Sequence, residues 1–215
     1  AQFIFIPTPS ITEKNCPDQT GRVFIVTGGY SGIDSELCKI LYQHNATVYV
    51  AGRSQTIAER AISSFKQAAP KALAGLSVET FLEKEKRLDI VVNNAAPHGM
   101  EIDDNGKPKD TDVLSRYGQS KAGNVFLARE YSRATPETGV VHACFNPGNL
   151  KSELQRHWGE MFIVVLKKLL FWPAVYGAYT ELWAALAPEL TLERSCSYLY
   201  PWGRFGSLPE GIETS

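Results

Sequence analysis

A tyrosine and a lysine stand four residues apart in the run Tyr117-Gly118-Gln119-Ser120-Lys121. Residues at this spacing lie on one face of a helix, so the phenol and the ammonium would be neighbours. A nearby cation favours the phenolate and lowers the pKa of the tyrosine, which suits a general acid or base acting on a carbonyl/alcohol pair. Taken alone, the pair also fits an ordinary solvated helix face, so its interpretation depends on the surrounding sequence.

A glycine-rich segment, Thr27-Gly28-Gly29-Tyr30-Ser31-Gly32, joins an apolar run at 23–26 to a helical pattern at 33–45. A glycine turn between a buried strand and a helix lets the backbone approach a pyrophosphate, and the helix N-terminus offers unpaired N–H groups. Any tight turn between a strand and a helix can also carry two glycines. The segment by itself therefore supports a dinucleotide site only weakly.

Arg53 follows a second apolar run, at 47–51, and comes about twenty residues after the glycine turn. An acidic residue at this point binds the ribose of NAD, whereas a guanidinium suits the additional 2′-phosphate of NADP. The alternative is a solvated surface arginine.

The rest of the chain alternates short apolar runs with helical patterns, which predicts right-handed βαβ units and a parallel sheet. We expect one Rossmann-like, doubly wound α/β domain over 21–215, with 149–215 on the substrate side, preceded by a surface arm at 1–20. Strands are predicted at 23–26, 47–51, 88–92 and 140–145, with a last one within 198–205; helices are predicted at 33–45, 57–69, 76–86, 113–133, 162–170 and 176–186; a loop is predicted at 100–112.

Four motifs follow one another along this pattern: Thr27-Gly28 with Gly32, Asn93-Asn94-Ala95, Tyr117 with Lys121, and Pro147-Gly148. In this order they resemble the classical short-chain dehydrogenase/reductase family. The sequence around Lys121, Pro147 and Trp202 is similar to that of fungal members close to retinol dehydrogenases and WW-domain-containing oxidoreductases. The resemblance runs from Gly21 to Gly206.

The resemblance implies NADP(H) as the cofactor, and hydride transfer to or from a small apolar carbonyl or alcohol substrate. It makes Tyr117 the proton donor or acceptor, and Lys121 the residue that holds the nicotinamide ribose. It implies no metal. The other cofactor residues would be Gly28, Tyr30, Ser31, Gly32 and Ile33 at the phosphates, Arg53 at the adenosine phosphate, Asn93 and Ala95 near the adenosine ribose, and Pro147, Gly148 and Ser152 beside the nicotinamide.

Two departures from the family pattern concern cofactor binding. Asp34 replaces the third glycine of the turn. Its carboxylate would cap the helix and repel a phosphate by about 3 kcal/mol, which predicts weakened binding. The stretch 70–87 has room for one helix but for little else, so the strand that ends in the family's acidic adenine-binding residue is expected to be missing.

A third departure concerns catalysis. Only the 22 residues 95–116 lie between Asn94 and Tyr117, too few for the family's helix with its relay asparagine and for its serine-bearing strand. Ser115 would point to a different helix face from Tyr117 and cannot replace that serine. Loss of one oxyanion donor typically costs about 100- to 1000-fold in rate.

The missing strand also affects the sheet. Without it, the runs 88–92 and 140–145 either pair directly or leave an exposed edge that favours association. The missing helix is half of the family's usual dimer contact, so the resemblance does not carry a homo-oligomer over to this chain.

Composition excludes several functional classes. A chain with 44% hydrophobic and 21% charged residues fits a soluble globule, and a formal net charge of −1 gives no basic field for nucleic acid. Four widely spaced cysteines without a CxxC pair favour free thiols and a cytoplasmic location. The apolar run 3–6 is too short for a signal peptide, and the run 161–172 is too short and too charged to span a bilayer. That run predicts a buried or surface-docked helix, with weak membrane-surface association as the alternative.

Three hypotheses follow. The chain is an NADP(H)-dependent oxidoreductase of reduced size; or it is a catalytically impaired relative that serves as a binding or scaffold protein; or it is a deleted version of a longer parent. Because one frame can support both active and inactive proteins, resemblance alone does not separate the first two.

Overall fold

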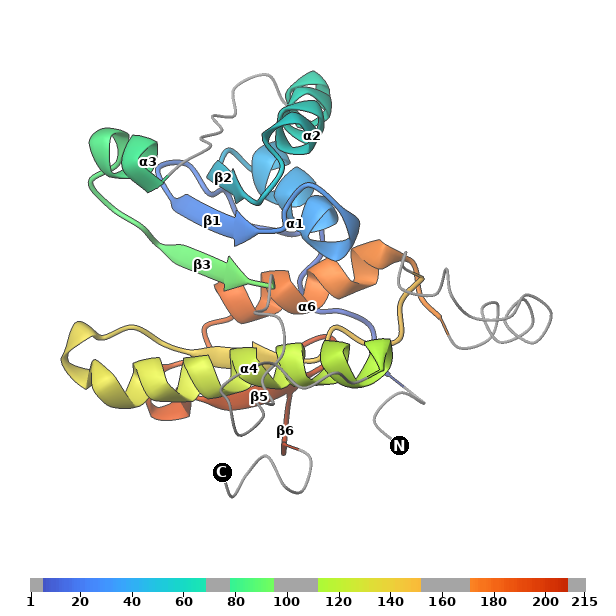
Figure 1. The fold of residues 1–215 in the computed structure, drawn as a ribbon, viewed down its shortest axis with the longest axis vertical. Helices are drawn as coiled ribbons and strands as arrows, with labels where there is room; N and C mark the ends of the chain where they lie inside the picture. Colours follow the sequence, from blue (N-terminus) through green and yellow to red (C-terminus); the bar gives the residue numbers. More distant parts are fainter. Residues whose placement is uncertain (1–5, 69–77, 95–111, 152–170, 209–215) are drawn as a thin grey trace.

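The computed structural model describes residues 6–68, 78–94, 112–151 and 171–208 (Figure 1). The predicted helix at 162–170, Ala95, Ser152 and nearly all of the predicted loop at 100–112 lie outside these ranges. The elements in chain order are β1 (Val23–Thr27), α1 (Gly32–Gln43), β2 (Thr47–Ala51), α2 (Gln55–Ala68), α3 (Val78–Lys84), β3 (Ile90–Asn93), α4 (Val113–Ala134), a 3-10 turn (Pro136–Thr138), β4 (Ala143–Phe145), α6 (Ala174–Leu186), a second 3-10 turn (Leu192–Arg194), β5 (Ser197–Tyr200) and β6 (Arg204–Gly206).

The first sheet contains three parallel strands in the order β2-β1-β3. Its central strand is apolar without alternation because both of its faces are covered: Phe24 and Val26 are fully buried on one face, and Val23 is buried on the other beside Phe81 of α3. Helix α1 packs its Leu37 and Leu41 into the same core. The predicted α/β frame of βαβ units with a reduced number of strands is therefore confirmed.

The second sheet has the order β4-β5-β6, with β4 and β5 parallel and β6 antiparallel to β5. The sequence predicted one strand within 198–205, but the chain forms two strands joined by a turn. Trp202 and Gly203 at this turn have φ values of +62° and +88°, a left-handed conformation that no strand accommodates.

Helix α6 lies between the two sheets (Figure 1). On one side Ala178 and Leu182 belong to the core of the first sheet. On the other side Trp183 packs with Leu199 of β5. A helix buried on opposite sides needs apolar residues around most of its circumference, which the sequence of α6 provides.

Strands β3 and β4, the neighbours of the predicted missing strand, belong to different sheets and do not pair with each other. Within the described ranges, β3 pairs only with β1. Val91 in the middle of β3 is 45% exposed. Of the two arrangements that the sequence left open, direct pairing is therefore not the one formed.

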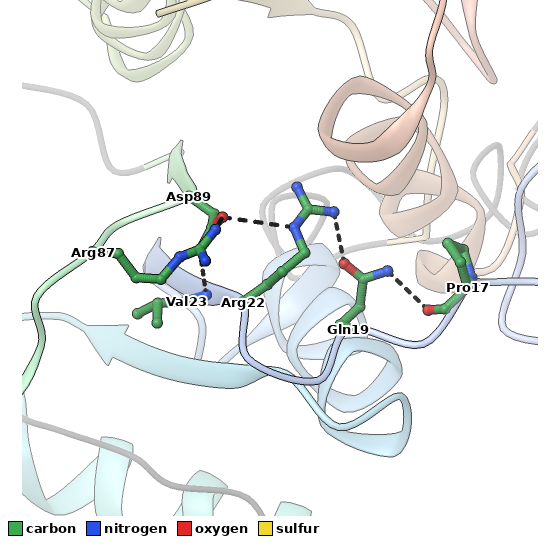
Figure 2. Close-up of polar contacts among 6 residues, drawn as sticks. All are labelled: Pro17, Gln19, Arg22, Val23, Arg87 and Asp89. Atoms are coloured by element: carbon green, nitrogen blue, oxygen red, sulfur yellow. Dashed lines mark hydrogen bonds and ion pairs between the residues drawn. The ribbon is translucent and has the colours of Figure 1, made fainter.

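A polar network fixes the amino ends of the strands on the side away from the glycine turn (Figure 2). Asp89 accepts a hydrogen bond from the backbone N–H of Val23 at 2.8 Å, is bound by Arg87, and lies 3.9 Å from Arg22. Arg22 in turn donates to Gln19, which is buried and donates to the carbonyl of Pro17. The network ties the segment before β1 to the start of β3.

The N-terminal arm packs on α1 and α6. Cys16 is buried, and the hydroxyl of Tyr179 on α6 donates to Glu13 at 2.5 Å. His44, just after α1, contacts the carbonyl of Glu13 through Nε2 at 2.9 Å.

In the part of the chain that the structure describes, no helix combines the length and apolar character needed to cross a bilayer.

Candidate active site

The glycine turn between β1 and α1 provides an open N-terminal helix end. Gly28 and Gly32 have φ values of +81° and +60°, which glycine adopts without strain. Nothing lies within 4 Å of a Cβ placed on Gly32. Ser31, the N-cap residue, makes no side-chain capping bond among the described residues. The first-turn N–H groups of Gly32 and Ile33 are therefore available to an anion.

The end of β3 is fastened beside this turn. The Thr27 hydroxyl donates to the carbonyl of Val92 at 3.3 Å and accepts the backbone N–H of Asn94 at 3.0 Å. Asn93 stands opposite Thr27 in the ladder. The Asn93-Asn94 motif thus lies at the carboxyl edge of the sheet, where ligands of open α/β sheets bind.

Helix α4 brings Tyr117 and Lys121 to the same edge. The Lys121 ammonium lies 5.6 Å from the ring centre of Tyr117, as the spacing of four predicts. It donates to the backbone carbonyl and to Oδ1 of Asn94, both at 2.6 Å. One turn further along α4, Asn124 donates to the carbonyl of Asn93 at 3.1 Å. The pair is therefore anchored at the end of β3, close to the glycine turn.

The sequence predicted that Lys121 lowers the pKa of Tyr117, and this prediction is wrong. Burial raises the pKa of Tyr117 above its ordinary value, although 40% of the residue is exposed. The ammonium of Lys121 is held by Asn94, and no hydrogen bond joins it to the phenol. Burial also lowers the pKa of Lys121, while the negative charges of Asp34 and Glu181 oppose this change. Tyr117 therefore keeps its proton at neutral pH.

The sequence predicted that the Asp34 carboxylate caps the helix and repels a phosphate, but this side chain is buried inside the protein. It is only 4% exposed, and its carboxylate accepts the Asn94 amide N–H at 2.5 Å. The same oxygen lies 3.9 Å from a Cβ placed on Gly28, so the carboxylate lies on the inner side of the turn. Its own backbone N–H and the charge of Lys121 stabilise the ionised form, although burial raises its pKa. The expected repulsion of a phosphate is reduced by this inward orientation and by the facing ammonium.

Arg53 lies in the bend after β2 and is exposed. It has no hydrogen-bond or ion-pair partner among the described residues and stands next to Gly52. A Cβ on Gly52 would meet the Tyr30 ring at 2.1 Å, so this ring rests directly on the backbone of Gly52. Tyr30 and Arg53 are thereby brought together at the carboxyl end of β2.

The Asn146-Pro147-Gly148 turn follows β4. Gly148 has a φ of +98°, and its N–H donates to Oδ1 of Asn146 at 2.9 Å. Two residues later, the side chain of Leu150 packs on Gly177 of α6, and the side chain of Ile33 of α1 packs on the same glycine. The glycine turn and the segment after β4 are therefore joined through α6, while Ser152 is outside the described residues.

Ser115 is engaged at the start of α4. Its hydroxyl donates to Asp112 at 2.5 Å and its N–H donates to the same carboxylate at 3.1 Å. This is a helix-capping arrangement, and it agrees with the prediction that Ser115 does not replace the family's serine.

Two polar residues of the site had no role in the sequence interpretation. Asn94 belongs to a recognised motif, but only its neighbour Asn93 was assigned to the cofactor. Glu181 is 1% exposed in the middle of α6. Its signal in the sequence is a single acidic residue within an otherwise apolar helical run, which indicates a buried charge that needs a partner.

Comparison with known proteins decides the family. No model of a known protein family matches the chain. The chain is 31% identical to a short-chain dehydrogenase/reductase of Phomopsis amygdali, over 98% of this chain and 87% of that protein. It belongs to the short-chain dehydrogenase/reductase family. A second member, from Neocamarosporium betae, is also 31% identical, over 94% of this chain and 82% of the relative.

This short-chain dehydrogenase/reductase is shorter than the region it matches. The alignment to the Phomopsis protein extends over 291 positions, whereas the chain has 215 residues, so the alignment contains gaps in this chain. Among solved structures, the fold is similar to that of an L-sorbose reductase from Gluconobacter frateurii, solved with NADPH and L-sorbose. The TM-score is 0.65 at 16% identity, covering 90% of this chain and all of the reductase. The Pseudomonas aeruginosa RhlG/NADP complex gives a TM-score of 0.64 at 16% identity, covering 86% and 95% of the two chains.

Proposed function

We propose that this chain is an NADP(H)-dependent oxidoreductase that transfers hydride between the nicotinamide and an apolar carbonyl or alcohol. One observation carries the proposal: the Tyr117 and Lys121 pair is anchored through Asn94 at the carboxyl edge of the sheet, beside an uncapped glycine turn. Membership of an oxidoreductase family supports the reaction class.

The described residues fit a dinucleotide phosphate. Gly28, Ser31, Gly32 and Ile33 offer a turn with free first-turn N–H groups and no side chain over Gly32. Tyr30 and Arg53 would border the adenosine ribose and its 2′-phosphate, which favours NADP(H) over NAD(H). Arg53 is exposed and has no partner in the part of the chain that the structure describes. Asn93, Ala95, Pro147, Gly148 and Ser152 would complete the cofactor site.

The bound cofactor supplies the hydride, and the chain supplies the proton and the orientation. Tyr117 holds a proton on its phenol oxygen and would donate it to the carbonyl oxygen of the substrate. Lys121 uses two of its three N–H donors on Asn94, which leaves one for a ribose hydroxyl. A phenol that retains its proton is the form that can donate to a carbonyl oxygen in the reductive direction.

Turnover is expected to be slow. Ser115 is occupied by Asp112, and none of the described residues offers a second donor shown to lie beside the Tyr117 phenol. Without such an oxyanion donor, the rate is expected to be about 100- to 1000-fold lower than with one.

An aromatic cluster supports an apolar substrate. Trp172, Tyr176 and Trp202 have ring centres 4.9 to 5.0 Å apart, and Trp172 is 39% exposed. The backbone of Trp172 bonds to Asn149 and Lys151, just after the Pro147-Gly148 turn. Aromatic side chains at this side of the site suit a lipophilic ligand.

All four cysteines are free, which supports a cytoplasmic location.

Fluorescence titration with NADPH tests the proposal, with NADH as the matched ligand. We expect saturable binding of NADPH, weaker binding of NADH, and slow NADPH oxidation with at least one member of a panel of apolar aldehydes and ketones. The absence of saturable binding at about millimolar NADPH would contradict the proposal, since this is a very weak affinity for a specific ligand. Binding without turnover across the panel would favour a binding protein.

A further inference from the structure

Two buried carboxyl groups meet beneath the glycine turn. Asp34 comes from the first turn of α1 and Glu181 from the middle of α6, and they are 4% and 1% exposed. Helices α1 and α6 pack against each other in one core, and the two carboxyls interact across this contact. Two adjacent carboxylates removed from water cannot both stay ionised, so such a pair retains a proton.

The surroundings show which carboxyl keeps its charge. Asp34 accepts the amide N–H of Asn94 and interacts with its own backbone N–H. Two buried carboxyl oxygens, Oε2 of Glu181 and Oδ1 of Asp34, have no hydrogen-bond partner among the described residues. A proton on Glu181 supplies the donor that this group of acceptors lacks. Burial and the neighbouring Asp34 raise the pKa of Glu181 well above its ordinary value, in agreement with this assignment.

Asn94 connects the carboxyl pair to Lys121. Its amide N–H binds Asp34 at 2.5 Å, while its Oδ1 accepts the Lys121 ammonium at 2.6 Å. An amide has a donor end and an acceptor end, so an acceptor at the position of Asp34 fixes which end faces Lys121. The backbone of Asn94 is held by Thr27 and also accepts from Lys121.

We propose that Asp34 and Glu181 are positioning residues that share one proton and, through Asn94, hold the Lys121 ammonium beside Tyr117. This inference rests on the proposed function, because the position of Lys121 matters for the reaction only if a cofactor binds there. It gives Asp34, a departure from the family pattern, a role in holding the catalytic lysine.

The charges of the cluster balance. With one proton, Asp34 and Glu181 together carry a single negative charge, opposite the single positive charge of Lys121. Among the described residues, Cys38 on α1 also faces the pair. Burial and both carboxyls raise its pKa well above the ordinary value, so it stays a neutral thiol. Burial alone would favour neutral Lys121, and the pair opposes this by favouring the ammonium.

NMR titration of the Lys121 side chain in the cofactor-free protein tests the inference, with Lys121→Arg to assign the signal. We expect Asp34→Asn to lower the pKa of Lys121, because it removes the negative charge that the pair presents to the ammonium. Glu181→Gln keeps a donor and the charge of the pair, so we expect it to leave this pKa near that of the unmutated protein. Glu189→Gln is the control, since Glu189 is exposed just beyond α6.

Two results would overturn the inference: an unchanged Lys121 pKa in Asp34→Asn, or equal changes in Asp34→Asn and Glu181→Gln. Should Asp34→Asn fail to fold, infrared spectroscopy of the unmutated protein provides the second measurement. A protonated carboxyl band is expected at neutral pH and should disappear in Glu181→Gln, and its absence would contradict the shared proton. Neither measurement requires NADPH, so both test the inference alone. Failure of the proposed function would be seen in a different experiment, as the absence of NADPH binding in the fluorescence titration.

Discussion

Ile33 of α1 lies directly against Gly177 of α6. A Cβ placed on Gly177 would come within 2.8 Å of Ile33 Cγ2 and 2.4 Å of Leu150 Cδ1. Real side chains do not approach this closely, so glycine is required for this packing. Helix α1 begins at the glycine turn. The packing of α1 against α6 therefore determines where the first N–H groups of α1 point.

Gly177→Ala is therefore expected to push α1 away from α6. We expect a loss of about 1–3 kcal/mol in the free energy of unfolding, because a methyl group is inserted into a filled space, together with weaker NADPH binding. Denaturant unfolding measures the first effect and fluorescence titration the second. Gly118→Ala in α4 is the control: nothing lies within 4 Å of its Cβ, and it should stabilise the protein by about 0.5–1 kcal/mol. Equal effects of both substitutions would contradict the packing argument.

Asp89→Ala should destabilise the edge of the first sheet shown in Figure 2. It leaves the N–H of buried Val23 without its acceptor, at a cost of about 1–3 kcal/mol in the free energy of unfolding. Bonds from Arg87 and from the Val23 backbone, together with the charge of Arg22, hold the pKa of Asp89 below its ordinary value although burial opposes them. Its contribution is therefore present above the ordinary carboxyl pKa and is lost as the pH falls through the folded-state value.

Denaturant unfolding of Asp89→Ala and the unmutated protein near pH 7 and near pH 3 checks both parts of this prediction. The difference between them should shrink in acid. A substitution at exposed Glu189 is the comparison and should change the free energy by less than about 0.5 kcal/mol. A difference that stays constant with pH would show that the charge of Asp89 does not contribute.

Glu181→Gln should stabilise the protein at neutral and alkaline pH. The pKa of Glu181 is raised in the folded state, so the native protein must hold a proton that the unfolded chain releases above its ordinary carboxyl pKa. Stability linked to this proton is complete below that ordinary value and is lost as the pH rises towards the folded-state pKa. Thermal melts across this range should show an advantage of Glu181→Gln that disappears in acid, with Glu189→Gln unchanged throughout. A variant less stable than the unmutated protein at every pH would refute this linkage.

Arg53→Ala should weaken NADPH binding without affecting NADH. A hydrogen bond from a guanidinium to a phosphate contributes about 1.5–3 kcal/mol, which corresponds to about a 10- to 150-fold increase in Kd. Calorimetric titration with both nucleotides measures the change. Arg60, exposed on α2, gives the matched control Arg60→Ala. Equal weakening of NADPH and NADH would place Arg53 away from the 2′-phosphate.

Local patterns in the sequence were sufficient for most of the frame. Strand β2 has the predicted bounds, and α4 begins at the predicted residue, because an apolar run and the Asp112 cap are local signals. The turn at Trp202 and Gly203 was missed, since a positive φ at a tryptophan has no signature in composition. The separation of β3 from β4 also depends on contacts between distant segments, such as those of α6 with α1 and β4.

The candidate site was predictable as a set of motifs but not as a network. The spacing of Tyr117 and Lys121 places them together on any helix. The inward orientation of Asp34 depends on Asn94 and Glu181, which come from distant parts of the chain. A pKa that depends on burial, such as that of Tyr117, is likewise set by tertiary packing and not by the neighbouring lysine alone.

The central claim is that Tyr117 and Lys121 act on a bound NADP(H), and isotope transfer tests it most directly. The protein is incubated with NADPH that carries deuterium on the transferable position and with an apolar aldehyde, and the alcohol is analysed by mass spectrometry. We predict one deuterium in the alcohol with the unmutated protein, and a rate about 100- to 10,000-fold lower with Tyr117→Phe, which should still bind NADPH. Deuterium transfer at the same rate in Tyr117→Phe, or none with the unmutated protein, would contradict the claim.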